Sequence, residues 1–168
     1  WSRDNLVANN TMAYTADVAI QLVPGEGGVS SGHRVVGNIL YSCGLATSSN
    51  RRDACIAVSL DASVGPQTLI GNLMYNPGRS VSVLYRRDWS EEAGRLRSAH
   101  GDTVEENRVA DPRFRDPEQA DFALLPDSPA IKAGRLIEVP GLIFTGTSVN
   151  SGAWQSSTAG QAGWSVAR

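Results

Sequence analysis

A short pattern built around an asparagine recurs three times along the chain and constrains the fold more than any other feature. The anchoring residues are Asn10, Asn38 and Asn72, which are 28 and 34 residues apart. Apolar runs flank each asparagine, Gly, Ser, Asn and Pro turns separate the runs, and no helical pattern intervenes. Short strands at such a period are typical of a solenoid in which parallel β-coils stack on one another. We therefore expect an all-β fold of about three coils.

A second apolar run follows each asparagine segment: Ala19–Val23, Cys55–Leu60 and Val81–Tyr85. Apolar residues alternate along these runs, which indicates strands with one buried side. The side chains that we expect to point inward and stack coil on coil are Val7, Ile20, Val35, Ile56, Val58, Leu69, Val81 and Val83.

The three asparagines have a structural explanation. Asparagine tolerates a left-handed backbone, and its side-chain amide can bond the same amide of the next coil. We therefore predict a ladder of Asn10, Asn38 and Asn72. A catalytic role is the alternative, but recurrence in every coil favours the structural one.

The segment from Ala110 to Gly134 carries three further motifs. They read Asp111-Pro-x-Phe114, Asp121-Phe-x-Leu124 and Ser128-Pro-Ala-Ile-x-Ala-Gly134. Together they resemble the closing segment of secreted right-handed parallel β-helix proteins, and Ser151-Gly-Ala-Trp154 resembles the ending of that family. The resemblance implies a right-handed parallel β-helix, a secreted or cell-surface location and a closing segment anchored by Phe114, Phe122 and Ile131.

The chain divides into four consecutive parts of one domain. We predict β-helix coils over 1–87, a lateral helix within 88–101, the closing segment over 102–134 and a partly flexible tail over 135–168. The helix, from about Trp89 to Ala99, is predicted from a capping-box pattern at Asp88 and Glu91 and from apolar residues on one helical face.

Charge and hydropathy exclude some classes of partner. The chain has 15 basic and 17 acidic residues without a sustained basic stripe, so we expect no nucleic-acid partner. No apolar run is long enough to cross a bilayer, so we expect no membrane insertion. The sequence starts at Trp1 in the middle of a repeat, and we interpret it as the C-terminal part of a longer protein. Further chain, or self-association, would then cover the first coil.

Two cysteines, Cys43 and Cys55, lie 12 residues apart. No histidine or second cysteine pair accompanies them at the spacing of zinc ligands, so we predict no metal here. A disulfide across one coil and a pair of small buried apolar side chains both fit.

An insertion in the second coil supplies candidate binding residues. About eight extra residues, Ala46–Asp53, separate Asn38 from the following strand, and they end in Arg51, Arg52 and Asp53. Tyr85, Arg86 and Arg87 follow the last strand of the third coil. Arginine forks match carboxylates and Tyr85 could stack on a sugar, so these six residues form a hypothetical uronate site. The alternative is a solvated loop with weak local ion pairs.

The resemblance implies a polysaccharide as partner, with two alternatives for activity. One is a lyase- or epimerase-like enzyme on an acidic polysaccharide, and the other is a non-catalytic adhesin, tailspike-like or structural module. No catalytic residues can be assigned: His33 and His100 fit general bases but also turn or helix caps. We identify no cofactor, and calcium is an alternative without support because Asp53, Asp61 and Asp88 lie on different coils.

Overall fold

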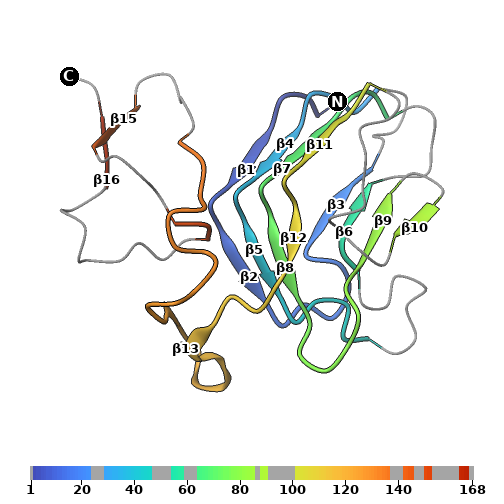
Figure 1. The fold of residues 1–168 in the computed structure, drawn as a ribbon. Coiled ribbons are helices and arrows are strands. Elements are labelled where there is room, and N and C mark those ends of the chain that lie inside the picture. The colour runs from blue at the N-terminus through green and yellow to red at the C-terminus, as the bar shows by residue number, and fades with distance from the viewer. Residues whose placement is uncertain are drawn as a thin grey trace.

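A parallel β-solenoid with three strands in each coil forms the body of the protein, as the repeat predicted (Figure 1). The computed structural model describes residues 2–23, 29–46, 54–58, 64–85, 88–90, 101–136, 142–145, 150–152 and 163–166. The strands of the first three coils are β1 (Leu6–Ala8), β2 (Thr11–Ala13), β3 (Ile20–Leu22), β4 (Arg34–Val36), β5 (Ile39–Tyr41), β6 (Ala54–Val58), β7 (Thr68–Ile70), β8 (Leu73–Tyr75) and β9 (Ser82–Tyr85). The predicted all-β class and the count of about three coils are confirmed.

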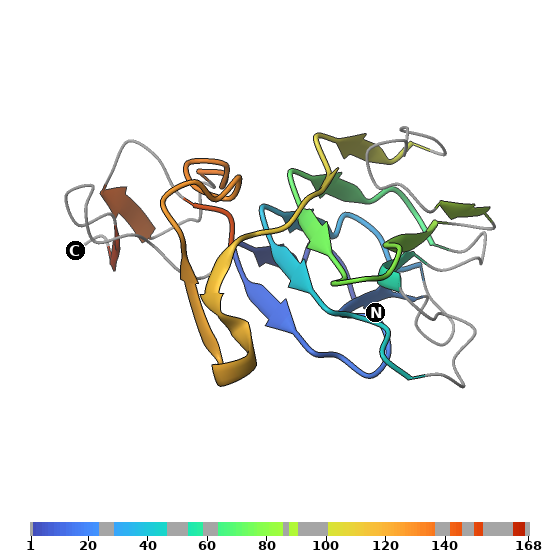
Figure 2. The same ribbon diagram turned by 60° about the horizontal axis from the view of Figure 1, so that its bottom comes forward.

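Equivalent strands of successive coils pair in parallel and form three sheets (Figure 2). Three more strands join these sheets: β10 (Asp88–Ser90), β11 (Thr103–Glu105) and β12 (Arg108–Val109). The strand orders are β1-β4-β7-β11, β2-β5-β8-β12 and β3-β6-β9, the last extended by β10. The register places Val7 beside Val35 and Val35 beside Leu69, so each inward residue lies on its counterpart in the next coil.

The coil stack continues beyond residue 87, where we placed its end. Residues that we assigned to the closing segment form β11 (Thr103–Glu105) and β12 (Arg108–Val109), which pair in parallel with β7 and β8. Val104 is buried in the solenoid interior and stacks on Leu69. An additional turn therefore begins at Gly101.

The prediction of a lateral helix is wrong at its first residues. Asp88–Ser90 is strand β10, which pairs antiparallel with β9 so that Trp89 lies opposite Leu84. The edge of β9 offers unpaired backbone groups, and satisfying them outweighs a local capping pattern. The rest of the predicted helix, residues 91–100, lies outside the described residues. Within the described residues the helical structure is one 3-10 turn, Pro117–Gln119.

The interior of the solenoid is apolar, and most of the residues that we predicted to point inward lie in it. Ile20, Val35, Ile56, Leu69, Val81 and Val83 are buried in one cluster, with Val7 packed against it. The side chain of Val58 lies outside the described residues. Cys43 and Cys55 also belong to this cluster as free thiols with no exposed surface, which is the second of the two alternatives that we considered for them.

The predicted asparagine ladder is present and has a fourth member, Asn107. Asn38 donates from its backbone and side-chain nitrogens to Asn72 Oδ1, at 3.1 and 2.9 Å. Asn72 donates in the same way to Asn107 Oδ1, and Asn10 to Asn38 Oδ1. The left-handed backbone, however, is adopted by the residue before each asparagine: Asn9, Gly37, Gly71 and Glu106 have positive φ.

A second ladder lies at the preceding corner and is built from different residue types: Asn5, His33, Gln67 and Asp102. The backbone N–H of Asn5 donates to His33 Nδ1, that of His33 to Gln67 Oε1 and that of Gln67 to Asp102 Oδ1. These bonds satisfy amides that the sheets leave unpaired at the corner. His33 is thus a buried corner residue, in line with the turn-capping alternative.

The closing segment covers the outer face of sheet β2-β5-β8-β12. It contains β13 (Phe114–Asp116) and β14 (Asp121–Leu124), an antiparallel pair. Phe114 and Ala130 are buried against Ile39, Tyr41 and Leu73, with Phe122 and Leu124 packed alongside. Ile131 is half-buried and lies outside this cluster, so its predicted role as a buried anchor is not met. Farther along the chain, β15 (Leu142–Thr145) and β16 (Gly163–Val166) also form an antiparallel pair.

Candidate functional site

Most of the residues predicted to bind a uronate lie outside the described part of the chain: Arg51, Arg52, Asp53, Arg86 and Arg87. The sixth, Tyr85, is buried in the solenoid interior. Its hydroxyl donates to Asp102 Oδ2 of the second ladder. In this position Tyr85 is a core residue and does not contribute to the surface described below.

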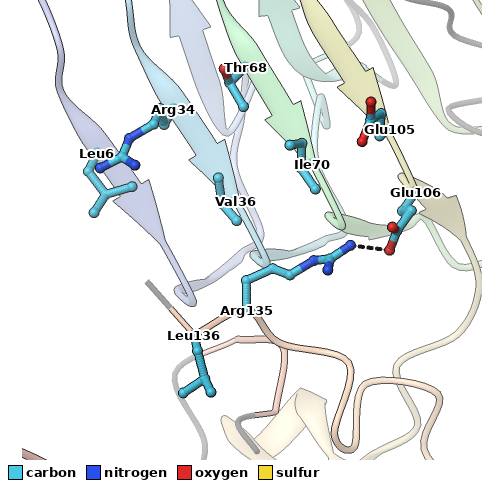
Figure 3. A pocket seen from close by; sticks show the side chains of 9 residues that line it. All are labelled: Leu6, Arg34, Val36, Thr68, Ile70, Glu105, Glu106, Arg135 and Leu136. Atoms are coloured by element: carbon cyan, nitrogen blue, oxygen red, sulfur yellow. Dashed lines mark hydrogen bonds and ion pairs between the residues drawn. The ribbon is translucent and has the colours of Figure 1, made fainter. Parts of the chain in front are cut away.

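A groove lies instead on the outer face of sheet β1-β4-β7-β11 (Figure 3). Its volume is about 360 Å³. The lining residues are Leu6, Arg34, Val36, Thr68, Ile70, Glu105, Glu106, Arg135 and Leu136. Strands supply the floor because alternate residues of each strand point outward, while the intervening Val7, Val35, Leu69 and Val104 fill the core.

Two columns of in-register side chains make up this floor. In one column, Leu6 lies beside Arg34, and Arg34 beside Thr68. In the other, Val36 lies beside Ile70, and Ile70 beside Glu105. The floor therefore combines an apolar centre with one cation, one hydroxyl and one carboxylate on separate strands.

A strap of the chain, residues 134–136, forms one wall of the groove. The side-chain amide of Asn9 donates to the backbone oxygen of Arg135 at 3.0 Å. The guanidinium of Arg135 reaches along the ends of the strands to an ion pair with Glu106, as Figure 3 shows. Gly37 permits this approach: a Cβ there would lie 2.4 Å from Asn9 Oδ1 and 3.3 Å from the Arg135 nitrogen.

The charges of the groove are arranged with opposite signs at its two sides. Arg34 and Glu105 are exposed, and within the described residues neither has an ion-pair partner. They lie two strands and two register positions apart, with a lateral separation of about 9–10 Å at the usual strand spacing. The pair Arg135–Glu106 is neutral as a unit. The groove therefore offers a free cation near Leu6 and a free anion near Ile70.

Neither a cluster of possible metal ligands nor His33 is found among the described residues that line the groove. The described residues contain no group of three or more His, Cys, Asp or Glu that could hold a metal ion. His33 is in the second ladder, where Nδ1 accepts from the Asn5 amide and Nε2 faces Ser30 Oγ at 2.8 Å. It does not line the groove.

Comparison of the chain with protein-family models, with curated proteins and with solved structures gives no match. In the described part of the chain, no helix has the length and apolar character needed to span a bilayer.

The sequence does not single out the groove residues by an insertion, because they occupy ordinary outward positions of the strands. Arg34 and Thr68 each precede a predicted inward residue, Val35 and Leu69. Placing these strands in register would have brought both side chains to one exposed column. The strap residue Arg135 carries no comparable local signal.

Proposed function

We propose that the outer face of sheet β1-β4-β7-β11 binds a segment of an acidic polysaccharide. The observation that carries this proposal is the guanidinium of Arg34, which has no ion-pair partner among the described residues and lies in a groove whose centre is apolar. A guanidinium binds a carboxylate by two parallel hydrogen bonds, which is the group that a uronic acid presents. The resemblance of the closing segment to that of polysaccharide-processing β-helix proteins supports the same class of ligand.

The apolar centre of the floor contributes a second element of recognition. Leu6 and Ile70 are half-buried, so each has apolar surface left to cover. The C–H face of a sugar ring can pack on such a surface while its hydroxyl groups remain at the edges. Thr68 and Glu105 are then positioned to exchange hydrogen bonds with hydroxyl groups.

The net charge of the groove restricts the class of polysaccharide that we expect it to bind. Two arginines and two glutamates line the groove, so its formal charge is zero. A polymer with a carboxylate on every sugar would place one carboxylate beside Arg34 and another beside Glu105, which repels it. We therefore expect preference for a chain in which uronic acid and neutral sugars alternate.

Isothermal titration with oligosaccharides of known composition tests the proposal. Arg34→Ala should weaken binding of a uronate-containing oligosaccharide by roughly tenfold or more, since a charge-assisted hydrogen bond contributes about 1.5–3 kcal/mol. Arg108→Ala is the matched control, because it removes the same charge from exposed strand β12 of the neighbouring sheet. Equal affinities of the two variants, or equal affinity for the same oligosaccharide after its carboxylates are reduced to alcohols, would contradict the proposal.

Incubation with the same oligosaccharides also tests for catalysis, which is separate from binding. A lyase would generate an unsaturated uronate with ultraviolet absorbance, and an epimerase would change sugar configuration without it. The proposal for this groove is binding, and it stands whether or not either product forms.

A further inference from the structure

The two cysteines, 12 residues apart in sequence, both lie in the interior of the second coil. Cys43 follows strand β5 at a corner, and Cys55 is the second residue of strand β6. Neither has exposed surface, and both belong to the same apolar cluster as Leu40 and Ile56. Two thiols that share one buried site are candidates for joint chemistry.

Backbone contacts with the first coil bring the cysteines near one another: Gly44, next to Cys43, donates to the Asp17 carbonyl at 2.9 Å, and Ala19, two residues on, donates to the Cys55 carbonyl at 3.0 Å. The interaction between the two thiols lowers the pKa of Cys43, with a further lowering by Thr15, and raises the pKa of Cys55 well above its ordinary value. The pair is therefore asymmetric. Cys43 is the thiol that ionises more readily and is the better attacking group in exchange with a disulfide.

Neighbouring coils fix the backbone on both sides of the pair. The Cys43 N–H donates to Asn76 Oδ1 of the third coil at 2.7 Å. The Cys55 carbonyl accepts from Ala19 of the first coil at 3.0 Å. The backbone at each cysteine is therefore fixed by a different neighbouring coil.

We propose that Cys43 and Cys55 form a redox pair that closes to a disulfide in an oxidising environment. The oxidant is a low-molecular-weight disulfide such as oxidised glutathione. Because neither thiol has exposed surface, the exchange takes place when the coil opens locally at Cys43. The Cys43 thiolate then attacks one sulfur of the oxidant, giving a mixed disulfide and one reduced glutathione. The Cys55 thiolate then attacks the Cys43 sulfur, which forms the protein disulfide and releases the second reduced glutathione. Two protons and two electrons leave the protein in total.

The bond would close the loop of residues 44–54, which includes the insertion Ala46–Asp53. A disulfide restricts the unfolded chain more than the folded one, so it stabilises the coil. In the reduced state the thiols fill their site as small apolar groups, and the fold is retained.

Redox equilibration of the folded protein tests this proposal. The protein is brought to equilibrium in glutathione buffers from both the reduced and the oxidised side, quenched in acid, and alkylated with N-ethylmaleimide in denaturant. We expect the wild type in oxidising buffer to lose two hydrogen masses, to take up no maleimide and to carry no glutathione. Its Tm should rise by roughly 5–10 °C over the value in dithiothreitol.

Cys43→Ala and Cys55→Ala are the controls, and their Tm should be the same in oxidising and reducing buffer. The wild-type comparison does not depend on how well either variant folds. Two maleimides on the wild type after oxidation, separate glutathione adducts on each cysteine, or a Tm independent of redox buffer would each overturn the proposal. All of these readouts are independent of polysaccharide binding.

Discussion

Of two outer faces of the same solenoid, one is covered by another part of the chain and the other is open. On sheet β2-β5-β8-β12, Ile39 and Leu73 are almost fully buried under Phe114 and the rest of the closing segment. On sheet β1-β4-β7-β11, the corresponding outward residues line an open groove. Both faces rest on one shared apolar interior, so the interior does not explain the difference.

The difference lies in the columns that the register creates. On the covered face, Ile39 lies beside Leu73 and Tyr41 beside Tyr75, so both columns are apolar or aromatic in the second and third coils. Each face has a column that ends in a charge, Arg108 on the covered face and Glu105 on the open one, but only on the open face does a charge, Arg34, interrupt a column. A continuous apolar column favours burial by another part of the chain, whereas a charge within the column resists it.

Substitutions at the corner between the two faces, where the asparagine ladder lies, should cause the largest loss of stability. Asn72→Ala removes the acceptor of two Asn38 donors and leaves them buried without a partner, which should cost about 4 kcal/mol of unfolding free energy. Asn10→Ala, at the exposed end of the same ladder, should cost about 1 kcal/mol or less. Urea denaturation measures both. Equal losses would mean that burial of the ladder does not determine its contribution.

Large-to-small substitutions on either side of that corner compare the faces directly. Leu73→Ala, on the covered face, should lower the unfolding free energy by about 3 kcal/mol through lost burial and a cavity. Ile70→Ala, on the open face, should lower it by about 1 kcal/mol, because this side chain is only half-buried. A larger loss for Ile70→Ala would show that the groove floor is the better-packed surface.

Alkaline pH should lower the stability of the protein through ionisation of Tyr41 on the covered face. Burial raises its pKa from 10.0 to about 12, with further contributions from Tyr14 and Asp111. Below the unfolded-state pKa the phenol is neutral in both states. As the pH rises toward the folded-state value, the unfolded chain ionises first, so stability falls by about 2–3 kcal/mol across this window. Tyr41→Phe should remove that part of the fall, measured by urea denaturation at about pH 9 and about pH 12. An unchanged fall would assign the effect to other groups.

The smallest effect on stability is expected for the residue most important to binding. Arg34 is exposed and lacks an ion-pair partner within the described residues, so Arg34→Ala should change the unfolding free energy by no more than about 0.5 kcal/mol. Thermal denaturation checks this. A large destabilisation would mean that weakened ligand binding by the variant reflects partial unfolding.

The fold was predictable because its strongest signals repeat. Asn10, Asn38 and Asn72 mark one corner of every coil in a single residue type. The second ladder has the same spacings of 28, 34 and 35 residues as the first, but its residue types differ, which conceals it in the sequence. Asn107 continues the first ladder and Asp102 the second, although Glu106 stands where Gly37 and Gly71 precede the earlier asparagines, which obscures the match.

The groove was less predictable because it depends on long-range contacts. That Arg34 and Thr68 share a column follows from register, and the register follows from the repeat. The wall follows from contacts between Arg135 and residues as distant as Asn9, which no local pattern encodes. The helix predicted at Trp89 was wrong at its start for a similar reason, since pairing with β9 decides the structure there.

The comparison of the two faces is tested most directly by mapping where a ligand binds. Backbone amide shifts in a ¹⁵N-labelled sample would be followed during titration with a uronate-containing oligosaccharide. The account predicts shifts that concentrate at Arg34, Thr68, Ile70 and Glu105 and leave Ile39–Tyr41 and Leu73–Tyr75 nearly unchanged. Shifts concentrated on the covered face, or no saturable shifts in the groove, would contradict it.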